Sequence, residues 1–156
     1  LGLDSLRNKG EQAISDYFEA GIQALEDGAF ALAQNHFESH LQTAPQDAEA
    51  WANLALACFW QKAYSAACQH WKTSLKSEWL PAVAENVSDS AFELVQESAF
   101  QHAADLYALL VERMPQLRGS LVWALRCANQ THQAEQLLQG YLKQDPHNLE
   151  LRLLDS

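Results

Sequence analysis

The feature that most constrains this chain is a small residue followed, one helical turn later, by a large one, in a pattern that recurs along the sequence. It occurs four times: Ala33 and Phe37, Ala67 and Trp71, Ala103 and Tyr107, and Ala134 and Leu138. Another set of small residues follows the same offsets of 34, 36 and 31 residues: Gly21, Ala55, Ala91 and Val122. Self-similarity at such a period indicates repeated helix–turn–helix units, each burying one face against its neighbours.

The clearest unit covers residues 48–81. Trp51, Leu54, Ala55 and Cys58 are spaced at three- and four-residue steps, so they share one face of a helix predicted over residues 48–61. A second helix is predicted over residues 64–77. The intervening turn, Lys62-Ala63, is so short that the two helices must form an antiparallel hairpin.

The residue types at these positions resemble a known family. Each unit approaches the pattern W-x2-L-(G/A), then Y-x2-A-x3-(F/W/Y), then a closing proline such as Pro45, Pro115 or Pro146. This pattern is similar to that of the tetratricopeptide repeat (TPR) family. The resemblance implies an all-α fold of antiparallel helix hairpins stacked as a right-handed superhelix, an α-solenoid, and it implies a scaffold that binds other proteins.

The resemblance divides the chain into an array and two ends. The array covers residues 14–146 in about four units, which are residues 14–47, 48–81, 84–115 and 116–146. The last unit is degenerate, since Arg118 stands where the pattern has an aromatic residue, and we expect this side chain to turn outward. Residues 1–13 form an N-terminal extension or short helix, whereas residues 147–156 begin a capping or further helix.

Charge and hydropathy exclude two classes of partner. The net charge is −10, from twenty acidic and ten basic residues, and no basic stripe is present to neutralise phosphates, so nucleic acid is not an expected partner. The longest apolar run, Leu54 to Trp60, is too short to span a bilayer. We therefore expect a soluble chain. Its compartment stays open, with the cytoplasm slightly favoured over the periplasm.

No motif predicts catalysis, a cofactor or a metal. The glycines are scattered rather than gathered in a phosphate-binding loop, and no nucleophile lies on a sharp turn. His36 and His40 are four residues apart, but no third ligand is near, so we interpret them as solvated or packing side chains. The three cysteines are interpreted as packing thiols. The chain is predicted not to be an enzyme.

The predicted interaction surface is the concave groove formed by the first helix of each unit. The residues that line this groove are each one position away from the residues that form the core. The fold does not require the groove residues to be apolar, yet most of them are large hydrophobic residues. The predicted partner-binding residues are Phe18, Ile22, Leu25, Leu56, Phe59, Trp60, Phe92, Val95, Trp123 and Arg126. The predicted acidic rim of the groove is Glu26, Glu49, Glu85 and Glu93.

An apolar groove with an acidic rim favours a hydrophobic or amphipathic peptide or helix with basic edges as the partner. Two alternatives remain open. In the first, the groove is filled by residues 1–13 or by a second copy of the chain, which makes the protein a homo-oligomer or a structural array. In the second, the chain is a regulatory arm of a larger enzyme or of a secretion or assembly complex.

Overall fold

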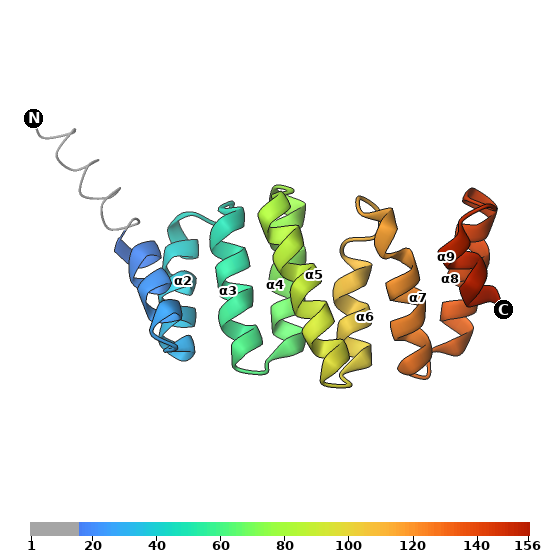
Figure 1. Cartoon of the computed structure of the whole chain (residues 1–156). Coiled ribbons are helices and arrows are strands. Elements are labelled where there is room, and N and C mark those ends of the chain that lie inside the picture. The colour runs from blue at the N-terminus through green and yellow to red at the C-terminus, as the bar shows by residue number, and fades with distance from the viewer. Residues whose placement is uncertain (1–15) are drawn as a thin grey trace, which may run out of the picture. The chain divides into compact units, whose positions relative to one another are not determined.

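The computed structural model describes residues 16–156, and every regular element in this range is helical (Figure 1). The extension predicted over residues 1–13 lies outside the described residues. The first described helix covers residues 16–26. The elements that follow are α2 (Phe30–Thr43), α3 (Ala48–Trp60), α4 (Tyr64–Ser77), α5 (Pro81–Gln96), α6 (Phe100–Ala108), the 3₁₀ helix η1 (Pro115–Leu117), α7 (Arg118–Cys127), α8 (Thr131–Gln144) and α9 (Leu149–Asp155).

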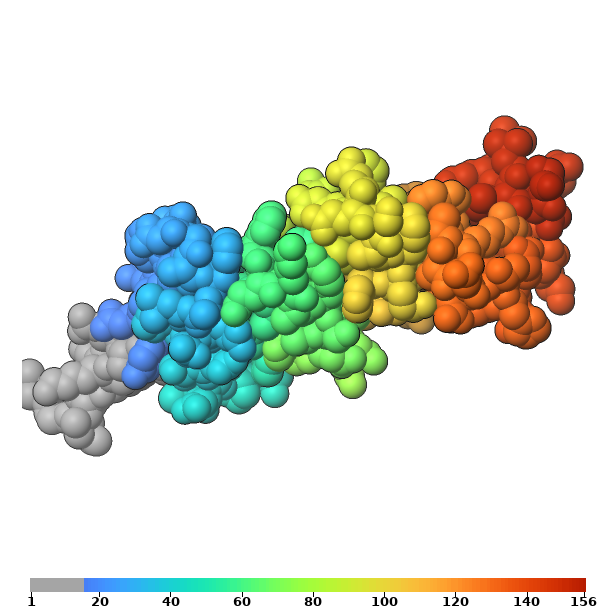
Figure 2. Space-filling view, turned by 90° about the horizontal axis from the view of Figure 1, so that it is seen from below, coloured from blue at the N-terminus to red at the C-terminus, as the bar shows by residue number. Residues whose placement is uncertain are grey.

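The chain divides into two compact units between Val83 and Ala84. In the first unit α3 packs on α2 and on α4, and in the second α7 packs on α6, α8 and α9. Within each unit, atoms of consecutive segments abut in the space-filling view (Figure 2). The predicted all-α helical repeat fold is therefore confirmed, and the helices predicted over residues 48–61 and 64–77 correspond to α3 and α4.

The same turn joins the two helices of every hairpin. A residue with a positive φ occupies each turn, and these residues follow the offsets found in the sequence: Gly28 (74°), Lys62 (64°), Ser98 (62°) and Asn129 (63°). The next amide in each turn donates a hydrogen bond back across the helix end, as Ala63 N does to Cys58 O at 2.9 Å. This geometry satisfies carbonyls that a helix terminus leaves without a partner, so it recurs even where the residue is not glycine.

The core of each hairpin is built on the small-then-large pairs. All eight members are buried: Ala33, Phe37, Ala67, Trp71, Ala103, Tyr107, Ala134 and Leu138. The small residue lets two helices approach closely, and the large one fills the space a turn further along. In the first unit the buried Ser74 hydroxyl also donates to Ala48 O at 2.6 Å, which ties α4 to the start of α3.

His40 is part of this packing. Its ring is buried, and its Nε2 lies 2.8 Å from Asp47 Oδ2. Asp47 is also the N-cap of α3, since its other carboxylate oxygen accepts from Ala50 N at 3.2 Å. The histidine therefore links the end of α2 to the beginning of α3. No group of three or more metal-ligating side chains occurs among residues 16–156.

The second unit departs from the regular hairpin in one place. Helix α6 ends at Ala108, and turns lead from there to η1 and α7. Leu110 fills the core below this segment with no exposed surface. Helix α9 follows an Asn148 N-cap, whose side chain accepts from Leu151 N at 3.1 Å, and it buries Leu151 against α7 and α8.

Protonation of His70 should lower the stability of the first unit. Burial against the Trp51 ring, 5.5 Å away, lowers the pKa of His70 from its ordinary value near 6.5, and Glu38 opposes this only in part. The unfolded chain therefore binds a proton at a higher pH than the folded chain does. Stability contributed by neutral His70 is present above about pH 6.5 and is lost as the pH falls toward the folded-state pKa.

We expect His70→Gln to reduce the loss of stability between about pH 7.5 and pH 5.5. Urea denaturation followed by far-UV circular dichroism at several pH values measures this slope. His132→Gln, a matched change at an exposed histidine of α8, is the control. An unchanged slope in His70→Gln would show that this histidine does not contribute to the pH dependence of folding.

Candidate interaction surfaces

Two of the predicted groove residues lie side by side in α3 but have opposite environments. Trp60 is 48% exposed, and its ring stacks on Phe30 at 6.1 Å with an interplanar angle of 20°. Phe59 is only 5% exposed, and its ring contacts Tyr64 at 5.4 Å and Trp71 at 5.7 Å, both on α4. The prediction that Phe59 lines an open groove is therefore wrong, because α3 is flanked by α2 and α4 and buries a wider face than one stripe.

The other predicted groove residues of the first unit are partly covered. Phe18, Ile22, Leu25 and Leu56 are half-buried. The Phe18 ring meets the edge of Phe37 at 5.8 Å and of His40 at 5.3 Å. Phe18 thus contributes to the core of the hairpin as well as to its surface, and Trp60 is the large exposed side chain among the predicted groove residues of this unit.

In the second unit two predicted groove residues are well exposed. Phe92 on α5 is 57% exposed and Trp123 on α7 is 42% exposed, whereas Val95 is half-buried. The Trp123 ring meets Phe100, the first residue of α6, edge-on at 5.6 Å. This contact holds the indole in place and leaves much of its surface open to solvent. Both exposed aromatic residues sit on first helices of their hairpins.

The charged residues predicted for the groove differ in whether they form an ion pair or are exposed to solvent. Arg126 is not a free cation, because its Nε donates to Glu135 Oε1 at 2.8 Å and its Nη2 lies 2.6 Å from the same oxygen. This ion pair joins α7 to α8. The four predicted rim acids are all exposed: Glu26, Glu49, Glu85 and Glu93.

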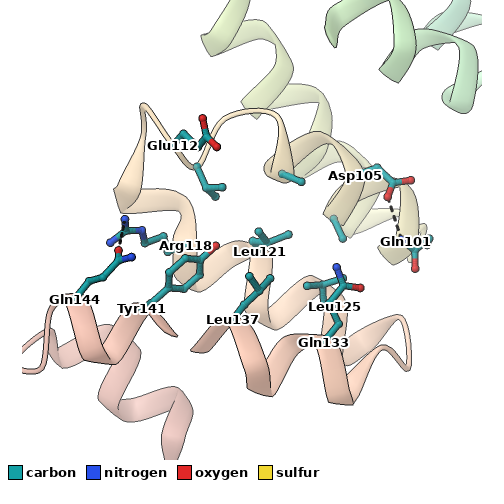
Figure 3. Close-up of a pocket in the computed structure, with 13 residues that line it drawn as sticks. Gln101, Asp105, Glu112, Arg118, Leu121, Leu125, Gln133, Leu137, Tyr141 and Gln144 are labelled. Atoms are coloured by element: carbon teal, nitrogen blue, oxygen red, sulfur yellow. Dashed lines mark hydrogen bonds between the residues drawn. The ribbon is translucent and has the colours of Figure 1, made fainter. Parts of the chain in front are cut away.

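A pocket in the second unit lies outside the set of residues predicted from the sequence. It has a volume of about 450 Å³ and lies between the second helices α6 and α8, with α7 also contributing to its floor (Figure 3). Its floor is apolar and is formed by Ala104, Ala108, Leu121, Leu125 and Leu137. Its rim is polar and includes Gln101, Asp105, Glu112, Arg118, Gln133, Tyr141 and Gln144.

Arg118 closes one end of this pocket rather than turning outward as expected. Its guanidinium lies over the Tyr141 ring, 4.8 Å from the centroid, and its Nη2 donates to Gln144 Oε1 at 3.1 Å (Figure 3). Both partners are on α8. Burial raises the pKa of Tyr141, and the arginine opposes that rise. The aromatic ring gives the cation a binding partner, so Arg118 stays against the protein and is half-buried.

Only part of the pocket has a signal in the sequence. Gln133, Leu137, Tyr141 and Gln144 follow one face of α8 at helical spacing, so their shared exposure to α6 could have been anticipated. Val111 and Glu112, which also line the pocket, lie beyond the end of α6 at Ala108, and no periodicity indicates that end.

The described cysteines lie on helices at different depths. Cys58 is buried, whereas Cys68 and Cys127 are half-buried. Burial raises the pKa of Cys58, and Glu38 raises it further, so its thiolate is disfavoured. None of the helices described for residues 16–156 has the length and apolarity needed to cross a bilayer.

Comparisons with known proteins add evidence on the fold alone. No protein-family model matches the chain, and no curated protein does. A solved structure of MamA, the RS-1 ArsTM double mutant, is similar over 89% of this chain and 79% of its own, with a TM-score of 0.55 and 15% sequence identity. Together with the repeated hairpins and their common turn, this likeness shows that the chain has a TPR-like helical repeat fold.

Proposed function

We propose that this protein is a non-catalytic interaction scaffold that binds a hydrophobic or amphipathic segment of another protein through exposed aromatic residues on its first helices. The observation that carries the proposal is the exposure of Phe92 and Trp123 in the second unit. The core of that unit is complete without them, since Val87, Ala91, Val122 and Leu125 are already buried. Large exposed aromatic residues that the core does not need are typical of recognition surfaces.

Trp60 is a third anchor of the same kind in the first unit. Its stacking on Phe30 restricts the indole, so a partner would lose little conformational entropy on binding to it. Trp60 in the first unit and Trp123 in the second are each held by a phenylalanine, so each indole by itself is suited to an apolar partner surface.

Charge favours a partner with basic flanks. Glu85 and Glu93 are exposed on α5, the helix that carries Phe92, and the whole chain has a net charge of −10. A basic partner would associate faster than a neutral one, and this advantage would diminish with salt. Burial of about 500 Å² of apolar surface would contribute about 12 kcal/mol before ordering costs, whereas micromolar binding needs about 8 kcal/mol.

The test compares proteins that co-purify with the wild-type chain and with the double variant Phe92→Ser/Trp123→Ser. We expect a bound protein to be retained by the wild type and its affinity to fall at least tenfold in the double variant, because each change removes an aromatic anchor. Pull-down with mass spectrometry identifies the protein, and titration with the purified partner measures the affinity. Thermal denaturation should show only a modest loss of stability, chiefly from the ring contact between Trp123 and Phe100, worth about 0.5–1.5 kcal/mol.

Leu32→Ser is the matched control. Leu32 is 50% exposed but lies on α2, a second helix, outside the predicted groove. Equal affinity for the wild type and the double variant would overturn the proposal. Sedimentation of the chain alone distinguishes the competing occupant: a wild-type dimer that the double variant converts to a monomer would assign the aromatic surface to self-association.

A further inference from the structure

We propose that the pocket between α6 and α8 is a second binding site, distinct from the aromatic surface, and that it takes the C-terminal end of a partner polypeptide with an aliphatic last residue. All of its lining residues belong to the second unit. It opens between second helices, whereas Phe92 and Trp123 are on first helices. The proposal follows from the chemistry of the floor, the cation at one end and the amides along the rim.

The floor selects an aliphatic group. Leu121 and Leu125 of α7 are buried beneath the pocket, and Leu137 of α8 is half-buried beside them (Figure 3). No aromatic ring other than that of Tyr141 lines the pocket, and Tyr141 is covered by Arg118. A volume of about 450 Å³ lies at the small end of the usual range for ligand pockets, which suits the last few residues of a chain rather than a long segment.

The cation at one end selects a carboxylate. Arg118 is half-buried, and within residues 16–156 its side chain contacts a neutral amide and an aromatic ring rather than a carboxylate. Its planar guanidinium has N–H donors beyond the one bonded to Gln144, so it can donate two hydrogen bonds to the two oxygens of a carboxylate. In a chain with twice as many acidic as basic residues, an arginine held over an apolar pocket without an acidic partner provides a specific attraction for an anionic group.

Asp105 sets the direction of the ligand. Asp105 accepts from Gln101 Nε2 at 3.0 Å and lies on α6, away from the Arg118–Gln144 pair (Figure 3). Glu112 lies on the Arg118 side of the pocket (Figure 3), but it is exposed and makes no ion pair with Arg118 in the described structure. A ligand with its negative charge at Arg118 and N–H donors toward Asp105 matches both ends, and a peptide that ends at Arg118 has this polarity.

The rim distinguishes a peptide from a simple fatty acid. Three glutamines surround the opening: Gln101, Gln133 and Gln144. Gln101 uses a donor in its bond to Asp105, and Gln144 uses its oxygen in its bond to Arg118, so the acceptor of the first and the donors of the second stay available. Amide groups of both polarities match the N–H and C=O groups of a peptide backbone, whereas a hydrocarbon chain offers them nothing.

The experiment titrates the full chain with N-acetyl-Gly-Ala-Leu-Leu, as the free acid and as the C-terminal amide, using backbone amide NMR shifts to locate and measure binding. We expect shifts on α6, α7 and α8, and about tenfold tighter binding of the free acid, because only it pairs with Arg118. In Arg118→Gln the two forms should bind equally. Lys143→Gln, which makes the same charge change on α8 outside the pocket, should keep the tenfold preference.

Several results would overturn the proposal. They are the absence of saturable binding by either form, equal binding of acid and amide to the wild type, and a preference that survives in Arg118→Gln. Octanoate binding as tightly as the tetrapeptide acid would assign the pocket to small carboxylates instead of a polypeptide end. The Phe92→Ser/Trp123→Ser variant should bind the tetrapeptide normally, so the two proposed sites can fail independently.

Discussion

Replacing Trp71 with alanine should destabilise the first unit by about 3–5 kcal/mol, a large share of the stability of a protein this size. Trp71 has no exposed surface and is the largest of the fully buried side chains. It packs against Phe59, whose own ring is buried, so neighbouring helices cannot close the space without breaking other contacts. Urea denaturation followed by circular dichroism measures the loss.

Two further tryptophan variants separate volume from polarity. Trp60→Ala is the control. The Trp60 indole is exposed, so its removal costs chiefly the ring contact with Phe30, worth about 0.5–1.5 kcal/mol. Trp71→Phe should cost much less than Trp71→Ala. The buried Nε1 of Trp71 has no hydrogen-bond partner among the described residues, so its removal breaks no hydrogen bond. Equal losses in Trp71→Ala and Trp60→Ala would refute the assignment of Trp71 as the centre of the core.

Gly21→Val should also destabilise the first unit, by about 1–3 kcal/mol, because it overpacks the core. A Cβ placed on Gly21 would lie 2.7 Å from the Cε1 and Cζ atoms of Phe37, closer than real contacts allow. The Phe37 ring has no exposed surface, and Phe18 packs on its edge, so it has no free direction in which to move. Thermal and urea denaturation of Gly21→Val measure the effect.

Gly140→Val is the matched control, because a Cβ at this exposed position of α8 would meet nothing within 4 Å. There, replacing glycine in a helix should be neutral or slightly stabilising. Replacing the Phe37 ring with a smaller side chain should partly restore the stability of Gly21→Val. The double variant Gly21→Val/Phe37→Leu should therefore lose less free energy of unfolding than the sum of its two single changes. Strict additivity of the two changes would contradict a direct steric clash.

The core of the hairpins could be predicted from the sequence, since its signals are local. A small residue and a large one, spaced by one turn, must share a helix face, and four such pairs at similar offsets must stack. Ala67 with Trp71 and Ala134 with Leu138 are buried as this argument requires. This holds even though the fourth repeat (residues 116–146) lacks the aromatic residues of the other repeats. The same offsets locate the turn residues from Gly28 to Asn129.

The candidate surfaces could be predicted only in part. The helix face beside the core residues carries aromatic side chains, and two of these, Phe92 and Trp123, are exposed. The same helical spacing predicts that Phe59 lies in the groove, but Phe59 is buried. Helical spacing gives the direction of a side chain on its own helix, but it does not reveal how many neighbours flank that helix.

The sequence by itself therefore determined the class of fold, the small-then-large core and the hairpin turns, because each depends on residues within one or two helical turns of one another. Only the tertiary structure decided which side chains of a face are covered. It buried Phe59 against α4, joined Arg126 to Glu135, and formed a pocket between α6 and α8 with Arg118 at one end. These outcomes depend on contacts between helices, whose separations and lengths are set by packing rather than by periodicity.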